Sequence, residues 1–146
     1  FEAAAAAYQD ALKLRNGFPP ALLGTMRLAL RRGDPDTAKL IFQEFPISKE
    51  YEKAELLMPV VKAMQDLQNH VLPAETDLDA AFANSVRLAI RGNLYASLDG
   101  LLGILRENKH YAKDRGKQVF IGLLELLDPD SKEVENYRRE LASAVF

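Results

Sequence analysis

The sequence predicts an all-α protein, specifically a tetratricopeptide-like helical repeat array of about eight antiparallel helices. Apolar residues recur at intervals of three and four, the period of an amphipathic helix, and rarely at the interval of two that is typical of a strand. The block RLALRRGD at residues 27–34 has a second copy, RLAIRGN, at residues 87–93. An alanine–aromatic pattern also recurs after 34 residues, the period of the tetratricopeptide motif.

The composition is that of an ordinary globular domain. The 146 residues are 48% hydrophobic and 27% charged, with a formal net charge of -2, so one domain with a buried core is expected. This weak charge does not favour nucleic acid or anionic lipid as a partner. No apolar run reaches the roughly 18 residues of a membrane span, and no signal peptide is evident. Cysteine is absent, which excludes thiol chemistry within these residues. The absence of cysteine also fits a reducing compartment, and we expect no membrane partner.

Apolar periodicity and helix-stop residues set the expected helices. The stops lie at Gly17, Gly33 and Gly92, because glycine adopts the left-handed conformation that closes a helix C-terminus. The expected helices span residues 2–15, 19–32, 35–45, 48–70, 77–92, 94–108, 112–127 and 132–146. The connections between them are short, as expected for antiparallel neighbours.

Capping residues precede several of these helices. Asp34 is expected to cap the helix after Gly33, Thr76 or Asp77 the fifth helix, and Ser131 the last one. Ser48 is expected to cap the fourth helix in the same way.

Proline and glycine predict two irregular features. Pro59 lies inside the fourth helix, where it removes a backbone donor, so we expect a kink or a break near Met58. Gly100 and Gly103 lie inside the sixth helix and are expected to permit close packing of another helix. The last helix should carry an inner face spaced at three and four, namely Val134, Tyr137, Leu141 and Val145.

The repeats organise the chain into units within a single domain, 1–146. Three pairs of residues are each 34 positions apart: Ala4 and Ala38, Tyr8 and Phe42, and Ala11 and Phe45. One repeat-like unit therefore lies near 2–46. A second lies near 79–108, where Ser97, Leu101 and Ile104 take the positions of Ala38, Phe42 and Phe45. An irregular helical spacer, 48–70, separates the two, and a C-terminal helix pair, 112–146, closes the array.

The second half of the chain resembles the C-terminal tetratricopeptide region of the thioredoxin-like co-chaperones of the YbbN (chaperedoxin) type. The resemblance rests on RLAIRGN at 87–93, LLGILREN at 101–108, RGKQVFIGLLELLDPDS at 115–131 and YRRELASAVF at 137–146. The first half, with LALRRGD and a spacer, fits the same layout. The family's thioredoxin-like domain is not in this sequence, so the chain is expected to be a fragment of a longer one that carries this domain at its N-terminus.

The resemblance implies a non-enzymatic domain that binds other proteins in the bacterial cytoplasm. The implied partners are chaperones, unfolded clients or the upstream thioredoxin-like domain. Two alternatives remain open at this point: a stand-alone tetratricopeptide scaffold of another bacterial complex, and a helical accessory domain of an enzyme.

The first candidate site is a peptide-binding groove on the first helices of the two units. Such helices line the concave face of a tetratricopeptide array, and arginine binds carboxylates with two parallel hydrogen bonds. The candidate residues are Leu23, Arg27, Arg31, Asn84, Arg87 and Arg91. The alternative is that the arginines are solvated and flank a core stripe.

The second candidate is the family's C-terminal motif, formed by Tyr137, Arg138, Arg139 and Leu141. The basic pair could contact a partner or the upstream domain. In the alternative interpretation, Tyr137 anchors the last helix in the core and the arginines pair with acidic neighbours on the same helix.

No catalytic residues, cofactor site or metal site are expected. His70 and His110 are isolated in the sequence and lack ligands at metal-binding spacing. The acidic residues cluster at helix starts, where carboxylates cap the helix and complement its dipole.

Overall fold

The computed structural model of the protein describes residues 18–146, and it is all-helical over this range. The seven described helices are α2 (Pro19–Arg31), α3 (Pro35–Gln43), α4 (Tyr51–Gln68), α5 (Asp77–Ile90), α6 (Leu94–Glu107), α7 (Tyr111–Leu124) and α8 (Lys132–Val145). The helix expected over 2–15 lies outside the described residues, as do Ala4, Tyr8 and Ala11 of the repeat pattern.

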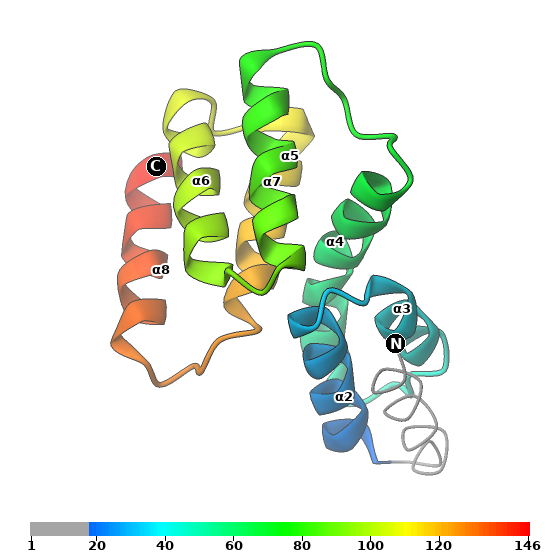
Figure 1. Cartoon of the computed structure of the whole chain (residues 1–146). Coiled ribbons are helices and arrows are strands. Elements are labelled where there is room, and N and C mark those ends of the chain that lie inside the picture. The colour runs from blue at the N-terminus through cyan, green and yellow to red at the C-terminus, as the bar shows by residue number, and fades with distance from the viewer. Residues whose placement is uncertain (1–17) are drawn as a thin grey trace.

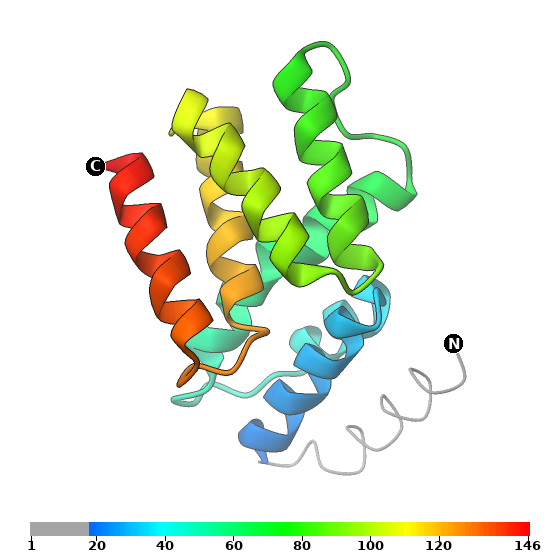
Figure 2. The same cartoon turned by 60° about the vertical axis from the view of Figure 1, so that its left-hand side comes forward.

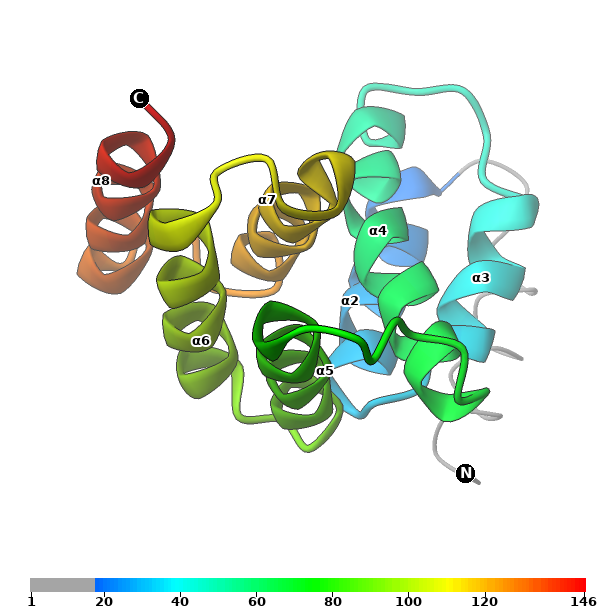
Figure 3. The ribbon, with the colours of Figure 1, turned by 90° about the horizontal axis from the view of Figure 1, so that it is seen from above.

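The helices form two antiparallel pairs that α4 and α7 join (Figure 1). α2 packs against α3, and α5 packs against α6. α4 runs between the pairs and lies along α7, while α8 covers the outer side of α6 (Figure 2). Seen from above, α8 and α3 occupy opposite edges of the array (Figure 3). The prediction of an all-α helical repeat array is confirmed.

The two copies of the glycine block form the same turn. Gly33 and Gly92 have φ values of 73° and 84°, in the left-handed region that only glycine enters without strain. In each turn the N–H group of the following residue donates to a carbonyl oxygen in the last turn of the helix, over 2.9 Å. Those following residues, Asp34 and Asn93, then cap the next helix through their side chains.

The two helix pairs also share their internal contacts. Thr25 in α2 and Ser85 in α5 each donate their hydroxyl to the carbonyl oxygen four residues earlier, over 2.8 and 2.9 Å. Ala38 and Ser97, the small residues at matching positions of the second helices, are both 0% exposed. Ser97 Oγ also donates to the Ser85 carbonyl oxygen over 2.6 Å, which fastens α6 to α5.

The close packing expected at two glycines of α6 occurs at one of them. A Cβ atom on Gly100 would collide with Ser85 Oγ, so Gly100 lets α6 approach α5 closely. Nothing in the described chain lies within 4 Å of such an atom on Gly103, which is exposed. The expectation for Gly103 was wrong, because this residue is on the opposite face of the helix.

The fourth helix has no break at its proline. α4 runs through Pro59 as one helix, so of the kink or break expected near Met58, the break does not occur. The proline leaves the carbonyl of Glu55 without its helical N–H partner, and Glu55 is exposed, so water can satisfy this carbonyl. Ser48 does not cap the helix. Its hydroxyl donates instead to the Pro46 carbonyl oxygen over 3.1 Å, and α4 has no side-chain cap.

α7 differs from the expected helix at both ends. Ala112, Lys113 and Asp114 have positive φ values of 53°, 57° and 72°, so its regular part begins after them. The helix ends at Leu124, and turns continue the chain toward Leu127.

α7 and α4 meet at their backbones. A Cβ atom on Gly122 would overlap the Leu56 carbonyl oxygen and Val60 Cγ2, both 2.6 Å away. The missing side chain thus allows α7 to lie directly on α4.

Candidate protein-interaction surface

The arginines of α2 that were predicted to line a groove contact the end of α7 instead. Arg27 pairs with Glu125 over 3.6 Å, and Arg31 Nε donates to the Leu126 carbonyl oxygen over 2.7 Å. Leu23 is 4% exposed and belongs to the core. In this half of the predicted site, the arginines hold α2 against the end of α7 and the leucine packs in the core.

The other half of that site lies at the surface of α5. Asn84, Arg87 and Arg91 are exposed, and the Asn84 side-chain oxygen accepts a hydrogen bond from Arg87 over 3.5 Å. The guanidinium groups of α2 and α5 therefore face different neighbours and do not form one clamp. Peptide binding by Asn84, Arg87 and Arg91 stays a prediction.

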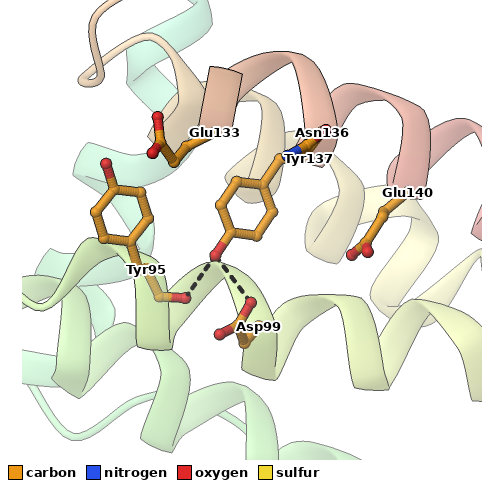
Figure 4. Close-up of a pocket in the computed structure, with 6 residues that line it drawn as sticks. All are labelled: Tyr95, Asp99, Glu133, Asn136, Tyr137 and Glu140. Atoms are coloured by element: carbon orange, nitrogen blue, oxygen red, sulfur yellow. Dashed lines mark hydrogen bonds between the residues drawn. The ribbon is translucent and has the colours of Figure 1, made fainter. Parts of the chain in front are cut away.

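Tyr137 of the C-terminal motif fastens α8 to α6 (Figure 4). Its hydroxyl donates to Asp99 over 2.9 Å and also lies 3.4 Å from the Tyr95 carbonyl oxygen. Its ring stacks on Tyr95 and meets Phe120 edge-on, with ring centroids 6.1 Å apart in both pairs. Burial and the hydrogen bond to Asp99 raise the pKa of the Tyr137 hydroxyl, so it remains a donor at neutral pH.

Carboxylates surround the pocket of about 370 Å³ beside Tyr137. They come from Asp99 of α6 and from Glu133 and Glu140 of α8 (Figure 4), and Glu140 pairs with Arg106 over 3.4 Å. Over residues 18–146, no cluster of His, Asp and Glu could hold a metal ion.

The remaining residues of the motif divide between two environments. Arg139 is exposed and donates to Asn136 over 2.7 Å on its own helix. Arg138 and Leu141 line a different depression on the other side of α8. The four residues of the motif therefore do not form one site.

This depression is an apolar groove of about 380 Å³ between α4, α7 and α8. We call it the α4–α7–α8 groove. Its apolar wall residues are Leu56 from α4, Ile121 and Leu124 from α7, Leu141, Ala142 and Val145 from α8, and Phe146 directly after α8. Leu56 is 40% exposed and Phe146 is fully exposed. An accessible apolar depression of this size is typical of a binding site.

Three charged residues form the rim of the groove: Lys117, Glu125 and Arg138. Glu125 is already paired with Arg27. Within residues 18–146, Lys117 and Arg138 have no carboxylate oxygen within 4.0 Å. The unpaired charge of the rim is therefore positive, with one cation on α7 and one on α8.

Sequence reasoning did not find this groove as a whole. It singled out Arg138 and Leu141 from a local motif, but Leu56 and Ile121 belong to helices that are distant in sequence. Both fit the apolar stripe of their own helix, so nothing in the sequence distinguishes them from core residues. Only the close contact at Gly122 brings them together.

A buried polar network holds α7 against α4 and α5. Tyr111 donates to Asp79 over 2.6 Å, and Arg115 donates to Asp66 over 2.6 Å while lying over the Phe82 ring. The hydrogen bond from Tyr111 lowers the pKa of Asp79, and burial together with this bond raises the pKa of Tyr111. Asp79 lies at the start of α5, where it forms a capping box with Thr76, and it also joins α5 to α7.

Burial works to raise the pKa of Asp66, but hydrogen bonds and positive charge from Arg115 and Lys62 bring it below its ordinary value. Asp66 is therefore a charged group that links α4 to α7. This network fixes the helices that form two walls of the groove.

The comparisons with known proteins agree with this architecture. No helix within residues 18–146 is long and apolar enough to cross a membrane. Searches of curated proteins and of solved structures give no match. A family model described as "Tetratricopeptide repeat" matches residues 60–146, more than half of the chain. Tetratricopeptide repeats generally mediate contacts between proteins. With its paired antiparallel helices and this match, the chain belongs to the tetratricopeptide repeat family.

Proposed function

We propose that this chain is the protein-binding domain of a thioredoxin-like co-chaperone that works in the bacterial cytoplasm. It binds unfolded client segments or chaperones and carries out no chemistry of its own. The α4–α7–α8 groove is the contact site. The co-chaperone role rests on the resemblance of residues 87–146, and the groove supports the binding role.

The observation that carries the proposal is an accessible apolar surface on a well-fixed helical scaffold. Leu56 and Phe146 expose large side chains at the groove, while the surrounding α7 residues Val119, Phe120 and Leu123 are almost completely buried. Apolar segments that unfolded proteins expose can bury area against such a surface, and each buried CH₂ group contributes about 0.8 kcal/mol.

The test compares two double variants that make the same chemical change at different places. Leu56→Ser with Phe146→Ser removes exposed apolar side chains from the groove. Leu40→Ser with Phe18→Ser removes them from α3 and the start of α2, where Leu40 and Phe18 are 44% and 58% exposed. Because all four side chains are accessible, neither pair should lower stability by more than about 1 kcal/mol.

Light scattering of a heat-denatured reporter enzyme measures client holding. We expect the full chain to suppress scattering, the groove variant to lose most of this effect, and the control variant to retain it. Equal suppression by both variants would show that clients do not bind in the groove. No suppression by the unchanged chain would contradict the client-holding role itself.

A further inference from the structure

We infer that the occupant of the α4–α7–α8 groove is an acidic amphipathic helix of a partner protein. This inference rests on the proposed function and adds the chemistry of the partner. The groove presents two apolar stripes, one on each helix wall, and its rim carries unpaired positive charge.

The spacing of the wall residues suits a helix. On α7 the lining positions Lys117, Ile121 and Leu124 are four and three residues apart, and on α8 Arg138, Leu141 and Val145 are three and four apart. Each row, a cation followed by two apolar residues, covers two helical turns, roughly 10 Å. A partner helix with apolar residues at the same spacing can lie along both stripes at once.

Charge decides which amphipathic helix fits. Glu125 is neutralised by Arg27, so Lys117 and Arg138 remain to attract carboxylates that flank the apolar face of the partner. Opposite charges at the rim of an interface favour one partner over another and accelerate association. A basic amphipathic helix would place like charges beside Lys117 and Arg138.

The chain's own N-terminal segment does not match this requirement. Residues 1–17 contain Glu2 and Asp10 but also Lys13 and Arg15, so the segment has no excess of acidic residues. A separate acidic segment is therefore the better occupant.

The test uses two labelled peptides that share leucines at helical spacing, with Glu between them in one peptide and Lys in the other. Fluorescence anisotropy follows their binding to the full chain. We expect the acidic peptide to bind more tightly, and its affinity to fall as salt is added. Lys117→Glu with Arg138→Glu should weaken its binding about tenfold. Arg32→Glu with Lys49→Glu makes the same charge change at exposed positions outside the groove and should leave the affinity within about twofold.

Equal affinity for both peptides, or no effect of the Lys117 and Arg138 reversal, would overturn the inference. The neutral pair Lys117→Gln with Arg138→Gln should weaken binding of the acidic peptide by about half as much as charge reversal does, on a logarithmic scale. This variant keeps the test valid if charge reversal disturbs folding. The Leu56→Ser and Phe146→Ser variant separates the two proposals. If it abolishes client holding while charge reversal changes nothing, the groove binds clients but its partner is not acidic. If the Leu56→Ser and Phe146→Ser variant instead leaves client holding intact, the proposed function itself fails at this site.

Discussion

The carbonyl oxygen of Ile90 occupies the place where the Cβ atom of any other residue at position 33 would lie. Gly33 lies in the turn after α2, and Ile90 is the last residue of α5. The turn between the two helices of one pair therefore touches the end of the first helix of the other pair. The facing residue, Gly92, is less confined, because a Cβ atom there would lie 3.6 Å from the Arg31 carbonyl oxygen.

This difference predicts unequal effects of the same substitution. Gly92→Ala should lower the free energy of unfolding by about 1 kcal/mol, the cost of a left-handed conformation for an L-residue. Gly33→Ala should cost at least about 2 kcal/mol more, because the backbone of α5 must also move. Urea denaturation of the two variants checks this, and similar midpoints would contradict the contact between the turns.

Arg31 and Arg91, the predicted groove arginines at matching repeat positions, should contribute unequally to stability. Arg31 is exposed too, but Arg31→Ala removes its hydrogen bonds to the Leu126 carbonyl oxygen, so we expect a loss of about 1 kcal/mol. Arg91→Ala affects an exposed side chain and should change stability by less than about 0.5 kcal/mol. Thermal unfolding of both variants is the measurement. A loss for Arg31→Ala no larger than that for Arg91→Ala would show that the contact between Arg31 and the Leu126 carbonyl is not stabilising.

The Asp66 link between α4 and α7 should make stability depend on pH. The pKa of Asp66 is lowered in the folded chain, so its carboxylate stabilises the fold above the ordinary Asp pKa of about 3.9, and this contribution disappears as pH falls through the lower folded pKa. Asp66→Asn should therefore destabilise the chain by about 1–3 kcal/mol near neutral pH. Its difference from the unchanged chain should shrink at about pH 3 and below.

Urea unfolding at both pH values tests this expectation. Glu55→Gln serves as the control, because Glu55 lies on the exposed side of the same helix. A difference for Asp66→Asn that stays constant with pH would mean that the carboxylate charge does not stabilise the fold.

Tyr137 should contribute to stability but not to binding in the groove. Tyr137→Phe removes the hydroxyl that reaches Asp99 but keeps the ring between Tyr95 and Phe120, so we expect a loss of about 1 kcal/mol. Binding of the acidic peptide should be unchanged, since Tyr137 lines the pocket on the other side of α8. Reduced peptide binding at unchanged stability would place Tyr137 in the interaction surface.

Much of the fold was predictable because local signals determine it. The repeated block around Gly33 and Gly92 carries its own stop and its own cap, so the two turns follow from sequence alone. Whether Pro59 would break the helix was not predictable, because the cost of the proline depends on whether the freed carbonyl reaches solvent, which is a tertiary property.

The candidate site was much less accessible to sequence reasoning. The paired arginines were identified from the repeated block, but that block does not reveal that the carbonyl of Leu126 lies beside Arg31. The groove was not predicted, since Leu56, Ile121 and Leu141 look like ordinary members of amphipathic stripes. Their role depends on how α4, α7 and α8 are spaced.

The spacing of α4 and α7 depends on Gly122, whose bare backbone rests on the Leu56 carbonyl. Two of the three groove walls are therefore in direct contact, and neither can separate or close without losing it. In the proposed groove a partner would meet these two walls already in contact, so no free energy is needed to open a space between them. Association should follow single-step kinetics whose rate rises in proportion to partner concentration, without a plateau set by a slow rearrangement of this chain.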